Sequence, residues 1–335
     1  MFGKTTRALF VLLSAMIVSE TTLSPVSAAA PQTILFTDNQ WDSQMFHNEL
    51  AKFIVENAFE DYKVEFSTGS STLNWQGMIN GDVDLDIESW TDNVATYEDD
   101  VARKDIVPLG ILVPDSAQGF YVPRYMIEGD PARGIEPLTP NLKNVADLVG
   151  HADVFKDPED PGRGRLYGAI PGWMIDEILY KKYEHYGLNE EYNYFRVGSE
   201  AVLFASLAGA YNLGEPWVGY CYEPTWVTGK LDVVLLGDAP YDPELYREGA
   251  CEIPRQALRV VCGGHFPEKA PELLDFFKQY RTGSALVSEA LARLEETKES
   301  HAATAVWFLK THDALLDEWL TPEGAKRARD TLTRR

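Results

Sequence analysis

The feature that most constrains the fold is an alternation of short strand-like runs and segments with helical spacing, which begins near Thr33. Thr33–Thr37 is rich in β-branched and apolar residues, as strands are, whereas Gln44–Ala58 places its apolar residues at helical spacing. Lys63–Phe66 and Leu73–Ile79 repeat the same order. Because this alternation favours parallel-type sheets with helices on both faces, we expect an α/β protein.

The chain has 335 residues, which is enough for two domains of ordinary size. Further strand-like runs lie at Val83–Glu88, Ile106–Val113, Gly119–Val122, Tyr167–Ile170, Tyr194–Val197, Val218–Tyr222, Val233–Leu236 and Ala257–Cys262. Helical segments are predicted at Asn144–Val149, Met174–Tyr186, Pro271–Tyr280, Ala285–Lys298, His301–Lys310 and His312–Leu320.

The closing helical run cannot easily form a domain alone, so we expect it to pack back on the first one. The predicted architecture is therefore two α/β lobes joined by two crossover strands, with a ligand cleft between them. Lobe I would comprise residues 31–113 and 257–335, and lobe II residues 114–256.

The N-terminus has the pattern of a secretory signal peptide. Lys4 and Arg7 precede an apolar run, Ala8–Val18, and small residues follow at Val26–Ala30. The apolar run is too short to span a bilayer, and no cysteine stands at the cleavage site to carry a lipid. We therefore predict a signal peptide of residues 1–28 and export of a mature domain to the periplasm.

The charge balance argues against two classes of partner. The chain carries 30 Lys and Arg against 52 Asp and Glu, a formal net charge of −22. Nucleic acids and anionic membrane surfaces require a cationic face, so neither is expected as a partner. A cationic ligand remains permitted.

Catalytic and metal-binding motifs are missing from the sequence. It contains neither HExxH nor GxSxG, and its histidines lack metal-ligand spacing. The three cysteines, Cys221, Cys251 and Cys262, allow one disulfide in an oxidising compartment, with three possible pairings and one thiol left over. We predict no enzymatic activity, no cofactor and no metal.

Several large aromatic residues lie at strand ends or in loops, where an exposed ring is costly unless it packs or binds something. These residues are Trp41, Trp90, Tyr121, Trp173 and Trp217. By contrast, Trp75, Trp307 and Trp319 lie in helical segments and are predicted to be core residues.

Trp90 has acidic residues on its own face of the strand. A period of two places Asp84, Asp86 and Glu88 on that face, and Leu85 and Ile87 on the other. Ligands of open α/β sheets lie beyond the carboxyl ends of the strands. The pattern therefore predicts a tryptophan that faces the ligand with an acidic group behind it, although a solvated acidic strand with a core tryptophan would look the same.

The order of these motifs resembles the substrate-binding proteins of ABC importers for quaternary amines, the glycine betaine, choline and proline betaine family. The resemblance covers the chain from about Thr33 to Leu320. It rests on the segments Trp41, Gly81-Asp82-Val83-Asp84, Glu88-Ser89-Trp90, Ile170-Pro171-Gly172-Trp173, Glu215-Pro216-Trp217, Tyr222-Glu223-Pro224-Thr225-Trp226 and Lys269-Ala270-Pro271-Glu272.

The resemblance implies a type II-like bilobed periplasmic-binding-protein fold that closes on its ligand. A monomeric binding protein would deliver a quaternary amine to a permease in the inner membrane. It also implies an aromatic box, which suits this ligand because a trimethylammonium group has no N–H to donate and is attracted to aromatic faces.

By resemblance and position, the box candidates are Trp41, Trp90, Tyr121 and Trp217. Trp173 is a further candidate, and the helix start at Gly172, Trp173 and Met174 could offer backbone N–H groups to a ligand carboxylate. Some betaine-binding relatives have a histidine just past the last box tryptophan, which Val218–Tyr222 lacks. The carboxylate partner therefore stays open, and Asn39, Asp42 or Ser43 could instead serve a hydroxyl.

Two alternative functions remain at this stage. Tryptophan stacking platforms also fit a binding protein for a sugar or an amino acid. An exported glycoside hydrolase could use Glu88 with another carboxylate, although the strand supplies no second opposed carboxylate.

Overall fold

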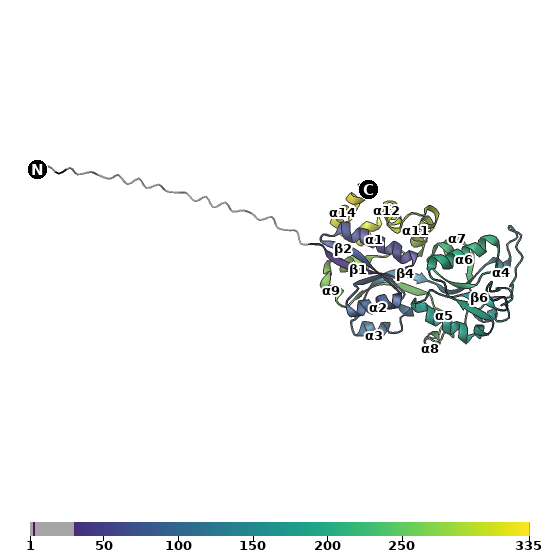
Figure 1. Ribbon diagram of the computed structural model, residues 1–335. Coiled ribbons are helices and arrows are strands. Elements are labelled where there is room, and N and C mark those ends of the chain that lie inside the picture. The colour runs from purple at the N-terminus through teal and green to yellow at the C-terminus, as the bar shows by residue number, and fades with distance from the viewer. Residues whose placement is uncertain (1–2, 4–29, 335) are drawn as a thin grey trace. The chain divides into compact units, whose positions relative to one another are not determined.

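The computed structural model describes Gly3 and residues 30–334. The predicted signal peptide of residues 1–28 therefore lies outside the described residues, apart from Gly3. Residues 31–334 contain two five-stranded sheets with helices on both faces of each, in agreement with the predicted α/β class (Figure 1).

The first sheet has the strand order β2-β1-β3-β10-β4. Its strands are β1 (Gln32–Asp38), β2 (Tyr62–Thr68), β3 (Leu85–Ser89), β4 (Ile106–Ser116) and β10 (Gln256–Gly263). The first three run parallel, but β10 is antiparallel to both of its neighbours. The sheet is therefore mixed, because the chain returns to it from the second sheet instead of crossing over through a helix.

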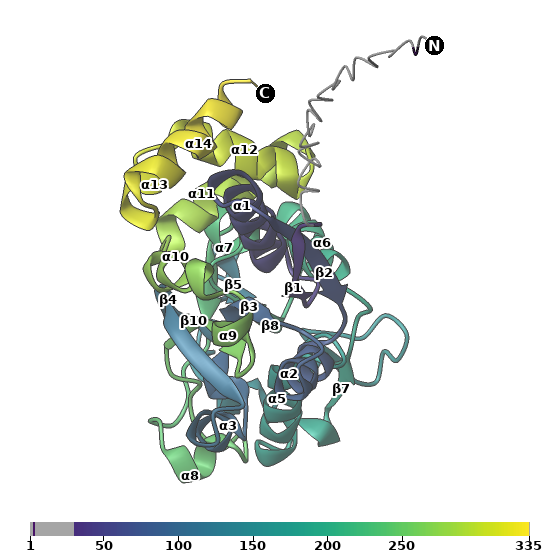
Figure 2. The ribbon, with the colours of Figure 1, turned by 90° about the vertical axis from the view of Figure 1, so that its left-hand side faces the viewer.

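Helices cover both faces of this sheet (Figure 2). One face carries α1 (Asp42–Ala58), α11 (Ser284–Thr297), α12 (His301–Thr311), α13 (Leu315–Trp319) and α14 (Pro322–Leu332). Their apolar residues form one core with β1, β3 and β10, which confirms that the closing helices pack on the first lobe. On the other face lie α2 (Ser71–Asn80) and α3 (Tyr97–Ala102). The helices α9 (Phe266–Lys269) and α10 (Leu274–Gln279) follow β10.

The second sheet has the order β7-β6-β8-β5-β9 and its own hydrophobic core. Its strands are β5 (Gln118–Pro123), β6 (Gly164–Tyr167), β7 (Tyr192–Phe195), β8 (Gly219–Tyr222) and β9 (Val233–Leu235). It is also mixed, since β5 is antiparallel to β8 and β9. The helices of this lobe are α4 (Tyr125–Glu128), α5 (Met174–His185), α6 (Glu200–Leu213), α7 (Trp226–Lys230) and α8 (Pro243–Tyr246).

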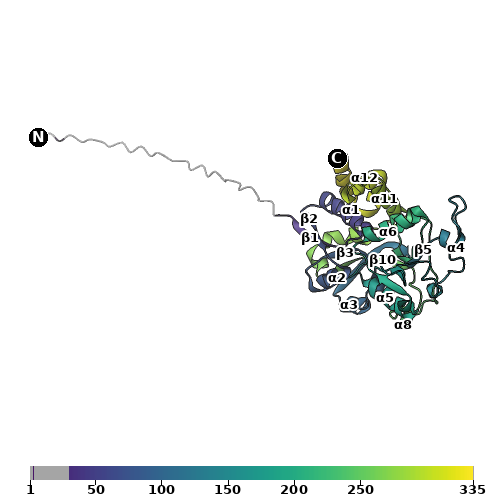
Figure 3. The same cartoon turned by 45° about the vertical axis from the view of Figure 1, so that its right-hand side comes forward.

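The chain passes between the sheets twice (Figure 3). Ala117 alone separates β4 of the first sheet from β5 of the second, and the chain returns between β9 and β10. The two lobes therefore share two connections, from β4 to β5 and from β9 to β10. The lobe boundaries at residues 113/114 and 256/257 stay a prediction.

Several elements differ from the sequence-based expectation, among them a strand and a helix of the second lobe. The strand predicted at Tyr167–Ile170 forms earlier, as β6. Helix α6 was not predicted, although Ser199 caps its start and Gly214, with φ 72°, ends it. Its apolar residues run all round the helix, and Val202 and Leu213 are exposed, so no clear stripe marks it in the sequence.

The disulfide that the sequence allowed is not formed, and all three cysteines are free and buried. Cys262 belongs to the core of the first lobe, while Cys221 and Cys251 belong to that of the second. Of the described helices, none is long and apolar enough to cross a membrane.

Candidate ligand-binding site

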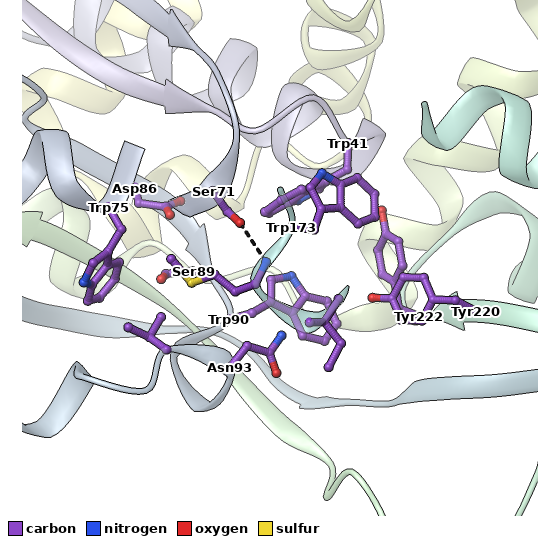
Figure 4. Close-up of a pocket in the computed structure, with 13 residues that line it drawn as sticks. Trp41, Ser71, Trp75, Asp86, Ser89, Trp90, Asn93, Trp173, Tyr220 and Tyr222 are labelled. Atoms are coloured by element: carbon purple, nitrogen blue, oxygen red, sulfur yellow. Dashed lines mark hydrogen bonds between the residues drawn. The ribbon is translucent and has the colours of Figure 1, made fainter. Parts of the chain in front are cut away.

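A pocket lies where the two lobes meet, and aromatic rings dominate its lining (Figure 4). The first lobe contributes Trp41, Ser71, Trp75, Asp86, Ser89, Trp90, Asn93 and Val94. The second lobe contributes Trp173, Met174, Ile175, Tyr220 and Tyr222. No Lys, Arg or His is among these thirteen described residues.

The rings around the pocket meet edge to face. Trp41 and Trp173 have ring centroids 5.3 Å apart and planes at 83°, and Trp90 and Tyr222 are 5.5 Å apart at 88°. Tyr220 and Tyr222 stack at 6.0 Å and 27°, because residues two apart on β8 share a face. Both edge-to-face pairs join one lobe to the other, so the aromatic enclosure exists only when the lobes are together.

The local structure sets the position of the two tryptophans of the first lobe. Trp41 is the residue before helix α1, and Trp90 directly follows strand β3. Both indole N–H groups donate to Oε1 of Glu88, at 3.0 Å from Trp41 and 3.4 Å from Trp90. Glu88 is fully buried, and this burial raises the pKa of its carboxyl to about 8.

The start of helix α5 is tied to the opposite lobe. The Met174 N–H donates to Oγ of Ser71 at 3.2 Å, and the hydroxyls of Ser71 and Thr72 donate to the Gly172 carbonyl. Gly172 has a φ of 89°, which L-residues rarely adopt. The sequence predicted that the Met174 N–H could bind a ligand carboxylate. In the structure this N–H already donates to Ser71 of the other lobe.

A second set of cross-lobe contacts surrounds the rings. The indole N–H of Trp173 donates to the Asn39 carbonyl at 3.3 Å. Glu200, at the start of α6, accepts from the Asp42 N–H at 2.7 Å and from the Tyr222 hydroxyl. Glu200 is buried, which raises its pKa well above the usual range. These bonds hold the lobes in a closed arrangement.

Asn93 is a polar residue of the lining whose side-chain oxygen is fully engaged. Its side-chain oxygen accepts from Tyr246 at 2.9 Å and from Gln118 and Gln256 at 3.1 Å each. Gln118 and Gln256 lie at the two chain crossings between the sheets. Because three donors hold its oxygen, the amide NH₂ is left as the end that can donate into the pocket.

The described residues include no cluster of three or more His, Cys, Asp or Glu side chains that could hold a metal ion. The pocket can enclose a small molecule between rings and offer it a few hydrogen bonds, chiefly from Ser71, Ser89 and Asn93.

Comparison with known proteins identifies the family. A family model described as the substrate binding domain of the ABC-type glycine betaine transport system matches residues 32–311. The chain belongs to this family. It is therefore a substrate-binding protein of the ABC transporter type.

Solved structures agree with this substrate-binding protein in fold. The glycine/betaine/L-proline-binding protein ProX of Borrelia burgdorferi is 19% identical, with a TM-score of 0.70 over 89% of this chain and 100% of that one. A choline binding protein solved with choline is 16% identical, with a TM-score of 0.71 over 90% and 98%. Lactococcal OpuAC, solved closed with glycine betaine, is 18% identical, with a TM-score of 0.66 over 87% and 100%. The bilobed periplasmic-binding-protein fold is thereby shown, while a comparison with curated proteins finds no match.

The substrate-binding protein brings some of its predicted site residues together and leaves others out. Trp41, Trp90, Trp173 and Met174 line the pocket, and Gly172 lies at the cross-lobe contact beside it. Tyr121 and Trp217 do not line it. Tyr121 is buried in the second lobe and its hydroxyl donates to Glu223, whereas Trp217 stacks on Tyr167 and donates to Ser206.

The alternation of side chains along strands explains this difference. Tyr220 and Tyr222 point from β8 into the pocket, so the odd-numbered residues of that strand, in phase with Trp217, point away. In the same way Gln118 of β5 reaches Asn93 and Tyr220, so Tyr121 lies on the opposite face. The sequence contained a signal for this difference. If side chains alternate along Val218–Tyr222, either the two tyrosines or Trp217 can face the pocket, but not both.

Proposed function

We propose that this protein captures a quaternary ammonium or related methylated onium compound in the periplasm and delivers it, as a monomer, to an ABC permease in the inner membrane. The observation that carries the proposal is the pocket itself. Six aromatic residues, Trp41, Trp75, Trp90, Trp173, Tyr220 and Tyr222, come from both lobes to line one site. Membership of the glycine betaine transport family supports the same ligand class.

The chemistry of the lining fits a methylated cation better than the other ligand classes. Aromatic faces attract a desolvated cation by about 2 kcal/mol or more each. A sugar would need many directed hydrogen bonds, but Ser71, Asp86, Ser89 and Asn93 are the main polar groups in the lining. An amino acid would bring a primary ammonium with three N–H groups to satisfy, for which the thirteen lining residues offer one carboxylate, Asp86, whereas a methylated ammonium needs only ring faces.

Glycine betaine and choline would use different polar ends of the pocket. The N–H of Ile175, next to Met174 in the first turn of α5, and the amide of Asn93 are donors that a ligand carboxylate could engage. A hydroxyl could donate to the Asp86 carboxylate. Delivery would follow from closure, since the enclosing ring pairs form between the lobes.

A ligand panel tests the proposal. Intrinsic tryptophan fluorescence and calorimetry should report saturable binding of at least one among glycine betaine, choline, carnitine, dimethylsulfoniopropionate and trimethylamine oxide. The matched control is the neutral isostere of choline, in which a tert-butyl group replaces the trimethylammonium group. It should bind at least about tenfold more weakly, because it keeps the shape and loses the cation–π attraction. Binding of a sugar with no response to any onium compound would refute the proposal.

A further inference from the structure

Glu88 accepts three hydrogen bonds, from two segments of the chain that lie at the pocket. Its Oε1 accepts from the Trp41 indole at 3.0 Å, the Trp90 indole at 3.4 Å and the Ser43 hydroxyl at 2.8 Å. Strand β3 supplies the carboxyl group, the start of α1 supplies Trp41 and Ser43, and the segment after β3 supplies Trp90. One side chain thus fixes the relative position of two pocket rings.

Glu88 does not itself line the pocket. It is fully buried and absent from the lining, so the two indoles stand between its carboxyl group and the ligand space. Any effect of Glu88 on binding must therefore pass through Trp41 and Trp90 or through its electric field. This distinguishes it from Asp86, which lies two residues earlier on the same strand and does line the pocket.

The charge around Glu88 is uncompensated. The titratable groups that face it are Asp86 on its own strand, Glu200 of α6, Tyr222 of β8 and Tyr280 after α10. None of them is a cation. His47, on the adjacent helix α1, is held neutral by burial, which lowers its pKa to about 3.

The second carboxyl oxygen of Glu88 also lacks a compensating partner. Oε2 is buried and has no hydrogen-bond partner among the described residues. A buried carboxyl group with an orphan oxygen and no counter-ion costs stability, so packing alone does not account for it. A cation held against the Trp41 and Trp90 rings would supply the missing opposite charge.

We propose that Glu88 is a positioning residue of the binding site, which fixes the Trp41 and Trp90 rings and makes the affinity for a cationic ligand depend on its own ionisation. This inference rests on the proposed function. The ionised carboxyl group accepts both indole N–H bonds, and its field adds to the attraction of the rings for a cation. Protonation removes that charge.

The direction of the pH effect follows from the burial of Glu88. With the carboxyl pKa raised to about 8, Glu88 loses its charge as the pH falls through that range. A bound cation favours the ionised form, so the affinity should be highest above about pH 8 and fall below it. Choline is the right probe, because its quaternary ammonium has no proton to lose and its own charge stays constant.

The test compares wild type with Glu88→Gln, which keeps the shape and a carbonyl acceptor but removes the charge. Wild-type affinity for choline should fall about tenfold between about pH 9 and about pH 7, as one coupled proton allows. Glu88→Gln should bind choline about tenfold more weakly at high pH and show a flat profile. Its affinity for the neutral tert-butyl isostere should change less than twofold.

Asp84→Asn is the matched control, since it removes another buried carboxylate of the β3 region that instead pairs with Lys269 and His265. This variant should lose stability and keep the wild-type pH profile. A Glu88→Gln protein with wild-type choline affinity and pH dependence would overturn the inference. If that variant does not fold, a flat wild-type profile overturns it equally.

A measurement without ligand separates this inference from the proposed function. The near-ultraviolet circular dichroism of the tryptophans should titrate near pH 8 in wild type and not in Glu88→Gln, because the indole bonds change with the charge of Glu88. Absence of this titration in the wild-type protein, or its persistence in Glu88→Gln, would contradict the positioning role even if onium ligands bind. Failure of every onium ligand with the titration intact would instead refute the proposed function.

Discussion

A methyl group added at Gly172 should act on closure as well as on folding. A Cβ at this position would lie 2.9 Å from the Cβ of Ser70, which is closer than such atoms approach one another. Ser70 belongs to the first lobe and Gly172 to the second, so this clash exists only when the lobes are together. The variant Gly172→Ala therefore probes the closed state.

Two separate costs are expected in Gly172→Ala. The φ of 89° strains an alanine by about 1–2 kcal/mol in both open and closed forms, which lowers the stability of the fold. Overpacking against Ser70 costs about 1–3 kcal/mol in the closed form alone. This second cost should weaken binding by about 5- to 150-fold, because ligand binding must then drive closure against it.

Calorimetric titration with choline and glycine betaine, together with thermal unfolding, separates the two costs. Ser70→Gly supplies the control, since it removes the Cβ that the new methyl group would meet. Glycine at this helix N-cap costs only a few tenths of a kcal/mol. The double variant should recover most of the affinity but not the lost stability. Wild-type affinity in Gly172→Ala, or no recovery in the double variant, would refute this account of closure.

Three further predictions follow from the site and its surroundings. Trp90→Ala should abolish the ligand response. Trp217→Phe should lower the melting temperature and leave affinity within about twofold, because Trp217 packs on Tyr167 away from the pocket. Equal losses of affinity in the two variants would contradict the assignment of Trp90, and not Trp217, to the pocket. Glu200→Ala, which removes the acceptor of the Asp42 N–H that joins the lobes, should weaken binding by about 5- to 10-fold, and small-angle scattering should show a more open ligand-free protein. Unchanged scattering and affinity would exclude that role. Buried His47, with its pKa lowered to about 3, binds its proton only in the unfolded chain, so stability should fall by about 1.4 kcal/mol per pH unit from about pH 6.5 towards pH 3. Urea unfolding at a series of pH values should show that the free energy of unfolding of His47→Gln depends less steeply on pH than that of wild type. An identical pH dependence would contradict this role of His47.

Local sequence patterns predicted most of the fold. The alternation from Thr33 onwards predicted the order of strands and helices, because hydrophobic periodicity and turn residues are local properties. The direction of β10 was not predictable in this way, since pairing depends on where the chain returns from the other lobe. Helix α6 was missed because its apolar residues form no stripe.

The candidate site was predictable in part for the same reason. Trp41 and Trp90 stand next to the ends of β1 and β3, and a residue at the carboxyl end of a parallel strand is placed by topology alone. Trp173 is similar, because it precedes the helix that follows β6.

What only the tertiary structure decided is which rings complete the enclosure. Tyr220 and Tyr222 of β8 face the pocket, because they are two residues apart on one strand. Trp217, which precedes the strand in the opposite alternation, packs in the core of its lobe. The link of Glu88 to both indoles and the bonds of Asn93 and Glu200 join segments far apart in the sequence. The sequence by itself determined an acidic, aromatic, strand-and-helix chain, because composition and periodicity are written locally. The pocket also depends on the packing of one lobe against the other, since each of its edge-to-face pairs, Trp41 with Trp173 and Trp90 with Tyr222, takes one ring from each lobe.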